Sequence, residues 1–113
     1  MGLRNVPTDE PGALADLISS RPGMVASRAL TRGTDVAMTL MSFSAGESVS
    51  EEVYPEDVMY LLAEGSARIT LPDREVIVGE GEVLAVPAGI QHAVELADPD
   101  RGIKLLQVHV PID

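Results

Sequence analysis

GEGEVLAVPAGIQH, residues 79–92, is the stretch that decides the fold. Its apolar run from Val83 to Val86 stops at Pro87, which lacks the amide hydrogen that a sheet ladder needs. Gly89 supplies the backbone freedom of a tight turn. In the segment that follows, His92 shares a face with two apolar side chains, because alternate residues of a strand point the same way. The stretch therefore predicts a hairpin that delivers one imidazole into the mouth of an apolar cavity.

Short strands divided by turn residues continue on both sides of this hairpin. Gly, Pro and Asp cluster between segments in which apolar residues alternate with polar ones. Strands repeated about every ten residues predict an all-β antiparallel sandwich or barrel, and periodicity alone does not choose between the two. The predicted strands span residues 24–31, 36–44, 49–54, 58–63, 66–71, 75–78, 83–86, 91–96 and 102–110.

Residues 1–23 lack this alternation. We expect an irregular N-terminal arm here, with one short helix over residues 13–19 that Thr8 or Asp9 caps. Residues 24–113 then form the single β domain that a chain of 113 residues allows. The residues expected to be mostly buried, either in the interior of this domain or in its outer packing layer, are Val36, Met38, Leu40, Val83, Ala85, Val94 and Leu106.

Charge and composition narrow the class of function. The formal net charge is −10, so the phosphates of nucleic acids and anionic membrane surfaces are repelled. The chain has no cysteine, which excludes disulfides, thiolate metal sites and a cysteine nucleophile. No apolar run approaches the ~20 residues of a membrane span, and residues 1–20 lack a basic start followed by an apolar stretch. We therefore expect a cytoplasmic protein that binds neither nucleic acid nor membrane.

The opening stretch also carries a resemblance to a known family. The second motif of the cupin superfamily, G-x5-P-x-G-x2-H, is matched without a gap by Gly81, Pro87, Gly89 and His92. The asparagine that closes this motif in the family is replaced by Leu96. The chain resembles small single-domain cupins of the type-2 kind from about residue 24 to residue 110. The resemblance implies a small antiparallel jelly-roll β-barrel, also called RmlC-like, whose interior holds a ligand or a metal ion.

The first cupin motif is degenerate, although its spacing is kept. Glycines stand at both ends of residues 46–65, but the two histidine positions between them hold Glu52 and Tyr54. The glutamate position holds Val58, or Asp57 if the strand carries a one-residue bulge. Two of the imidazole ligands that the family uses are therefore missing.

The resemblance implies two alternative states of the site. In family members that bind metal, the residue matching His92 is a ligand; Glu52 would then face it as an oxygen donor, and Asp57 would supply a third ligand. A divalent metal ion is thus the one cofactor left open. Alternatively, Tyr54 fills the space of the metal and hydrogen-bonds to His92 or Glu52, which favours a barrel with little or no tightly bound metal.

The two states of the site correspond to two classes of function. A binding module for a small molecule would use His92, Tyr54, Glu52 and Gln107 as ligand-binding residues. The alternative is a metal-dependent cupin enzyme of the dioxygenase, isomerase or decarboxylase type, which would use a Glu/His site. A third, metal-free possibility is a lyase or isomerase with His92 as general base and Tyr54 as acid.

The last predicted strand and the first one bear on the surroundings of the site. Gln107 shares a strand face with His109, for which we expect an outward or interface position, while the face of Leu106 is expected to be core. Residues 24–30 would leave an open sheet edge. Because small cupins usually pair through their sheets, we expect a two-fold homodimer.

Overall fold

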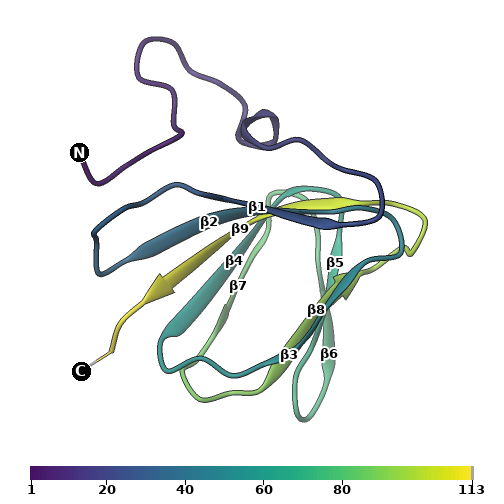
Figure 1. The fold of residues 1–113 in the computed structure, drawn as a ribbon. Coiled ribbons are helices and arrows are strands. Elements are labelled where there is room, and N and C mark those ends of the chain that lie inside the picture. The colour runs from purple at the N-terminus through teal and green to yellow at the C-terminus, as the bar shows by residue number, and fades with distance from the viewer. Residues whose placement is uncertain (113) are drawn as a thin grey trace.

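The computed structural model of the chain describes residues 1–112, which form nine β-strands and one turn of 3-10 helix (Figure 1). Every predicted strand is present, and its ends lie within two residues of the predicted ones. The strands are β1 (Val25–Ala29), β2 (Ala37–Phe43), β3 (Ser48–Glu52), β4 (Asp57–Glu64), β5 (Ala67–Thr70), β6 (Glu75–Val78), β7 (Val83–Val86), β8 (His92–Leu96) and β9 (Ile103–Val110).

Two antiparallel sheets face each other across the interior. One has the strand order β1-β2-β9-β4-β7, and the other has the order β3-β8-β5-β6. Figure 1 shows the chain crossing repeatedly between the two sheets, so that hydrogen-bonded neighbours such as β2 and β9 are far apart in sequence. This connectivity is that of a double-sheet jelly roll. The predicted all-β fold, a small antiparallel jelly-roll barrel, is confirmed.

Apolar side chains from both sheets fill much of the space between them. Phe43, Leu62 and Leu105 from the five-stranded sheet and Ile69 from the other sheet are at most 1% exposed. Full burial of such a side chain stabilises the fold by roughly 1.5–3 kcal/mol. Val94 of β8 is buried in this core as predicted.

The predicted inner face of β7 is wrong. Val83 is 57% exposed and Ala85 is also exposed, whereas Val86 is buried. The reason is the register with β4, where Val86 lies opposite the buried Val58 and must therefore share its inward direction. Because all four residues of β7 are apolar, the sequence pattern does not indicate which face points inward. Val36, just before β2, is likewise exposed rather than buried.

A second apolar cluster joins the N-terminal arm to the outer face of the five-stranded sheet. Figure 1 shows the arm lying over this sheet. Ile18, Leu30 and Leu40 form the buried centre of the cluster. Met38 and Leu106 pack against it and are half-buried. Leu40 is thus buried as predicted, in an outer packing layer beneath the arm.

The helix predicted over residues 13–19 is shorter than expected. It is the 3-10 helix η1 (Leu14–Leu17), whose N-cap is Ala13 and whose first turn has no side-chain cap. The predicted caps Thr8 and Asp9 are therefore wrong. A segment of four residues is too short for a stable α-helix, so packing of its leucines against the sheet holds it in place.

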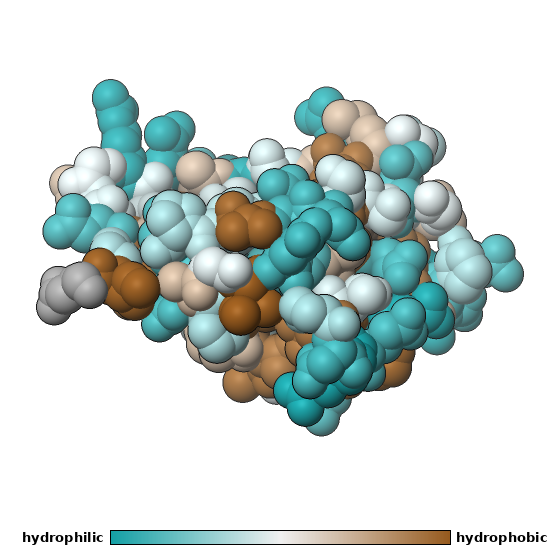
Figure 2. All heavy atoms as spheres, turned by 90° about the horizontal axis from the view of Figure 1, so that it is seen from below, coloured by the Kyte–Doolittle hydropathy of each residue, from teal (hydrophilic) through white to brown (hydrophobic). Residues whose placement is uncertain are grey.

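The surface mixes charged and apolar side chains. Figure 2 shows one face on which hydrophilic side chains surround separate apolar ones. Over residues 1–112, no helix has the length and apolar character needed to span a membrane.

Candidate functional site

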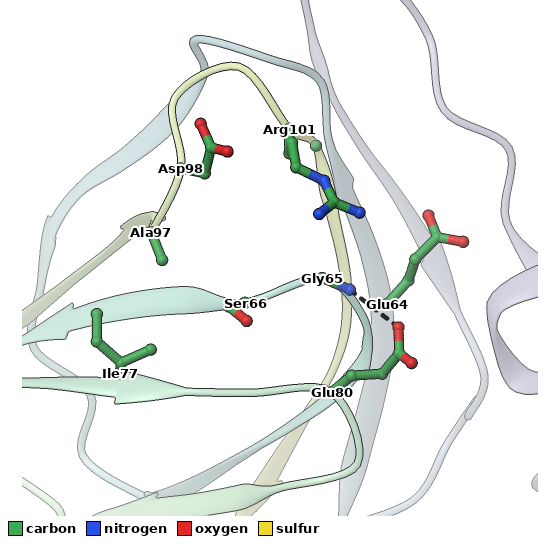
Figure 3. Close-up of a pocket in the computed structure, with 9 residues that line it drawn as sticks. Glu64, Gly65, Ser66, Ile77, Glu80, Ala97, Asp98 and Arg101 are labelled. Atoms are coloured by element: carbon green, nitrogen blue, oxygen red, sulfur yellow. Dashed lines mark hydrogen bonds between the residues drawn. The ribbon is translucent and has the colours of Figure 1, made fainter.

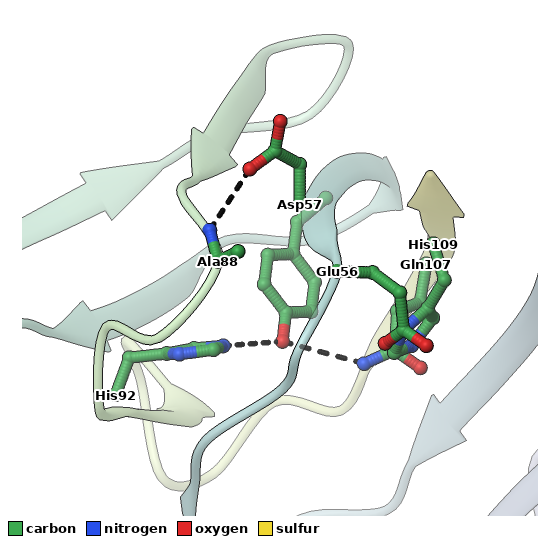
Figure 4. Close-up of polar contacts among 7 residues, drawn as sticks. Glu56, Asp57, Ala88, His92, Gln107 and His109 are labelled. Atoms are coloured by element: carbon green, nitrogen blue, oxygen red, sulfur yellow. Dashed lines mark hydrogen bonds and ion pairs between the residues drawn. The ribbon is translucent and has the colours of Figure 1, made fainter. Parts of the chain in front are cut away.

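The turn between β7 and β8 sets the position of the site's histidine. Gly89 has a φ of 80°, in the left-handed region that favours glycine. Its N–H donates to the carbonyl oxygen of Tyr54 at 2.9 Å, and the N–H of Ala88 donates to Oδ1 of Asp57 at 2.8 Å (Figure 4). These bonds hold the β3–β4 loop against the turn, so Tyr54 and His92 line one cavity.

A directed chain of hydrogen bonds runs through His92. Its Nδ1 lies 3.0 Å from the carbonyl oxygen of Ile90, which can only accept, so Nδ1 carries the proton. In the neutral ring Nε2 is then an acceptor, and the Tyr60 hydroxyl donates to it at 2.7 Å (Figure 4). The amide nitrogen of Gln107 donates in turn to the Tyr60 oxygen at 3.3 Å. Both nitrogens of the 3%-exposed His92 are therefore satisfied.

Burial changes the acidity of the tyrosines in this chain. Desolvation raises the pKa of Tyr60 to about 12, although the hydrogen bond from Gln107 partly offsets the rise. Desolvation also raises the pKa of Tyr54, and the negative charges of Glu52 and Glu56 add to that increase. At neutral pH both hydroxyls keep their protons, as the donation from Tyr60 to His92 requires.

These groups line a cavity between the two sheets. Its empty volume is about 310 Å³, of which only about 20 Å³ admits the centre of a water molecule. That is room for about one water, since one needs roughly 10–15 Å³ by this measure. The polar groups form part of the wall and apolar side chains form the rest. The lining residues are Met41, Phe43, Val49, Ser50, Glu52, Tyr54, Tyr60, His92, Val94, Leu105 and Gln107.

Glu52 and Tyr54 both lie on this cavity, at the two positions where the cupin motif has histidines. Glu52 is the register partner of His92 across β3 and β8, so the two side chains share one face. The ring centroid of Tyr54 is 5.9 Å from that of His92. The hydroxyl that bonds to His92 is that of Tyr60, however, and not that of Tyr54 or a group of Glu52.

Asp57 does not reach the cavity. Its carboxylate accepts from Ala88 at the turn, and β4 pairs with β9 without a shift from Asp57 to Leu62. The bulge that would have turned Asp57 inward is therefore absent at this position, and the register shift in β4 falls between Leu62 and Glu64. Within residues 1–112 no three His, Cys, Asp or Glu side chains gather as metal ligands. The donor set thus falls short of the three protein ligands usual for zinc or ferrous iron.

His109 lies on the inner side of β9, beside the cavity. Its ring meets that of Tyr54 edge to face, with centroids 4.6 Å apart, and its Nδ1 is 3.2 Å from Oε1 of Glu56. The expected outward position is therefore wrong. The register explains why, because His109 lies opposite the buried, inward-pointing Val58 of β4. The Leu106 face of the strand packs under the N-terminal arm instead.

A larger and more open groove, with an empty volume of about 1470 Å³, lies elsewhere on the barrel (Figure 3). Glu64, Glu80, Asp98 and Arg101 contribute to its lining and are exposed. Glu80 accepts from the N–H of Gly65 at 3.2 Å and so supports the β4–β5 turn. Because these charged groups are exposed and, within residues 1–112, no salt bridge joins them, the cavity at His92 is the better candidate site.

Comparison with known proteins settles the family. A crystal structure of a cupin superfamily protein from Desulfitobacterium hafniense DCB-2 is 39% identical, and the match covers 97% of this chain and 98% of that one with a TM-score of 0.90. The chain belongs to the cupin superfamily. A cupin 2 conserved barrel domain protein from Leptotrichia buccalis is 32% identical, with a TM-score of 0.78, over 86% of this chain and 46% of its own length. An uncharacterized protein of Streptomyces coelicolor is 29% identical over 80 residues, which are 71% of this chain and 74% of that protein. No protein-family model matches the sequence.

Sequence reasoning missed one polar group at the centre of this cupin's site. Tyr60 lies within a predicted strand, but neither motif marks its hydroxyl as the partner of His92. The available signal was the alternation of Val58, Tyr60 and Leu62 on one face of that strand. A tyrosine between two buried aliphatic residues is itself buried and needs a hydrogen-bond partner.

Proposed function

We propose that this cupin binds a small polar molecule in its barrel and has little or no tightly bound metal. The observation that carries the proposal is the hydrogen-bond chain from Gln107 through Tyr60 to His92, on the wall of an otherwise largely apolar cavity. A few convergent polar groups within an apolar lining are typical of ligand sites. Glu52, the register partner of His92 on the neighbouring strand β3, adds a charged group to the cavity wall.

The state of His92 supports a site without a tightly held metal. Coordination through Nε2 would displace the buried hydroxyl of Tyr60, which would then lose its acceptor. Leaving such a buried group unpaired costs roughly 1–3 kcal/mol. The rings of Tyr54 and Tyr60 also lie close to the imidazole, with centroids 5.9 Å and 5.6 Å from that of His92.

The proposal is tested by binding and elemental analysis on protein purified without a histidine tag. In solution NMR, small alcohols, amides, amines and carboxylic acids are titrated while the His92 and tyrosine ring signals are followed. We expect at least one class to shift these signals saturably, and iron, nickel and zinc to stay well below one equivalent after dialysis against a chelator. A panel in which no class perturbs the ring signals would contradict the binding proposal.

A metal-dependent enzyme of the dioxygenase, isomerase or decarboxylase type is the second candidate. One observation favours it, namely that Glu52 and His92 face each other directly across β3 and β8. About one tightly bound ion per chain, lost both in His92→Ala and in Glu52→Ala, would support this candidate over the first. Asp57→Asn is the matched control, because its carboxylate bonds to the turn and should leave metal content unchanged.

We also propose that two copies pair through β1. This strand is an edge of the five-stranded sheet and hydrogen-bonds to β2 on one side. An open edge is satisfied when a two-fold partner adds its own edge strand. Light scattering at micromolar concentration should give the mass of a dimer, and Ser27→Pro in the middle of β1 should shift it toward the monomer. A monomeric wild-type protein would contradict the proposal.

A further inference from the structure

The cavity offers a ligand more hydrogen-bond acceptors than donors. The single O–H of Tyr60 is already donated to His92, and one N–H of Gln107 is donated to Tyr60. The amide oxygen of Gln107 has two lone pairs and the ionised Glu52 accepts only, whereas the hydroxyls of Tyr54 and Ser50 on the same lining each have one O–H to donate and two lone pairs to accept. Within residues 1–112 no side chain hydrogen-bonds to the Glu52 carboxylate, in contrast to Glu51, which is bonded to Gln91.

The charge of the lining has one sign. Glu52 is the acidic member of the lining set, and no Lys or Arg belongs to that set over the described residues. Outside this lining, Glu56 adds a second carboxylate beside His109. The negative charges of Glu52 and Glu56 reach the Tyr54 hydroxyl, whose pKa they help to raise. An anionic ligand would enter this field without a cation to meet it.

The size of the cavity restricts what can occupy its polar end. The space for about one water matches a head group such as an ammonium, which has about the size of a water molecule. Apolar carbon attached to that head would lie against Met41, Val49 and Leu105. The aromatic rings of Tyr54 and Tyr60 line the same space, and a cation over a tyrosine face is favourable.

We infer that the cavity takes a small primary ammonium ion, with its N–H groups directed to the Glu52 carboxylate and the Gln107 amide oxygen and its alkyl group against the apolar wall. This inference rests on the proposed binding function and names its ligand class. Three N–H donors and one positive charge complement the acceptors and the single negative charge. A primary amine is protonated at neutral pH, as is the lysine side chain with its pKa of ~10.4.

The test uses methylammonium chloride as the probe in an NMR titration of the full chain at neutral pH. Acetamide and sodium acetate serve as neutral and anionic probes of similar size, and tetramethylammonium chloride carries the charge without N–H groups. Potassium chloride keeps the ionic strength equal in all four titrations. We expect methylammonium alone to shift the tyrosine and His92 ring signals saturably.

Two isosteric variants locate the charge. Glu52→Gln removes the carboxylate in the cavity, and Glu51→Gln removes its neighbour, an exposed side chain bonded to Gln91. Both change the net charge equally. Loss of a charge-assisted hydrogen bond predicts at least about tenfold weaker binding in Glu52→Gln. An exposed charge contributes little, so Glu51→Gln should change binding by less than about twofold.

The other outcomes distinguish failure of the ammonium inference from failure of the proposed binding function. Saturable shifts with acetamide or acetate but not with methylammonium would overturn the ammonium inference and leave the binding function in place. Equal binding of tetramethylammonium, or equal weakening in the two variants, would also overturn it, because the N–H groups or Glu52 would then not matter. A lack of shifts with every probe would contradict the binding function itself. Circular dichroism of both variants checks that they keep the wild-type fold, which the comparison between them requires.

Discussion

The hydroxyl of Tyr60 lies 2.7 Å from Nε2 of His92, and this hydrogen bond joins the two sheets of the barrel. Tyr60 belongs to β4 of the five-stranded sheet, whereas His92 begins β8 of the four-stranded sheet. Their side chains are 2% and 3% exposed, so water cannot readily replace either partner. The residue that marks the cupin motif is therefore also part of the barrel's internal polar structure.

Removing either partner should cost stability. Tyr60→Phe leaves Nε2 of His92 without its donor, and a buried unsatisfied group costs roughly 1–3 kcal/mol in the free energy of unfolding. Tyr54→Phe is the matched control, because Tyr54 is only half-buried and makes no hydrogen bond to His92. We expect it to change the free energy of unfolding by about 0.5 kcal/mol or less. Urea denaturation measures both.

A double-mutant cycle then isolates the bond itself. In Tyr60→Phe combined with His92→Leu, neither residue leaves the other with an unpaired group, so the loss should be smaller than the sum of the two single losses by about 0.5–3 kcal/mol. Strictly additive losses would show that the two residues contribute independently, and the hydrogen-bond chain would then not be a unit.

The tyrosines should titrate at unusually high pH. The chain has two tyrosines and no tryptophan, so the near-ultraviolet absorbance of tyrosinate reports on these two alone. Burial raises the pKa of Tyr60 to about 12 and raises that of Tyr54 as well. In Tyr54→Phe the remaining group should titrate near the higher value. A midpoint close to the ~10 of a free tyrosine would contradict the burial of Tyr60.

The same shift makes stability depend on alkaline pH. The folded state holds the Tyr60 proton more tightly than the unfolded state, so its contribution is fully present below pH ~10. It is then lost as pH rises through about 12, the pKa in the folded state. Two pKa units correspond to a loss on the order of 2–3 kcal/mol. Tyr60→Phe should lack this part of the alkaline loss, which denaturation at several pH values measures.

The strands were predictable because turn residues separate them in the sequence. Pro87 and Gly89 end one strand and turn the chain, and the structure has β7 and β8 on either side of them. The inner face of β7 was not predictable, because Val83 to Val86 are all apolar. Only pairing with β4 selects a face, and that pairing is a long-range contact which no local pattern encodes.

The site was predictable in part for the same reason. His92 and Glu52 line the cavity, where strand alternation and the motif positions place them. Gln107 also lines it, although the sequence predicts an outward or interface position for His109 on the same strand face. Tyr60 and His109 were missed as neighbours, since their inward direction depends on the register of β4 with β9. Asp57 was assigned to the wrong environment, because a bulge changes a side chain's face without any distinct sequence signal.

A matched pair of valines tests the corrected face of β7. Val86→Thr places a hydroxyl in the core beside Val58, where no partner is available, and should cost roughly 1–3 kcal/mol. Val83→Thr makes the same chemical change at a residue that is 57% exposed, so its effect should stay within about 0.5 kcal/mol. Thermal or urea denaturation compares them. The opposite order of effects would restore the face predicted from the sequence.

The last prediction concerns the two glycines that bound the degenerate motif. Gly46 and Gly65 have φ angles of 84° and 75°, so alanine at either position carries the left-handed penalty of roughly 1–2 kcal/mol. The sites differ in the space around them. A Cβ at Gly46 would meet no atom within 4 Å, whereas one at Gly65 would lie 2.9 Å from the carbonyl oxygen of Gly102 and 3.1 Å from Cγ2 of Ile103.

Gly65→Ala should therefore be the more harmful change. The neighbouring Ile103 is 1% exposed and paired with Phe43 in the sheet, so the backbone at Gly102 cannot move aside without disturbing β9. We expect Gly46→Ala to lower the free energy of unfolding by about the left-handed penalty alone, and Gly65→Ala to lower it by about 1–3 kcal/mol more, as overpacking does. Urea unfolding of the two variants gives the difference directly, and equal losses would show that the barrel yields at the β4–β5 turn.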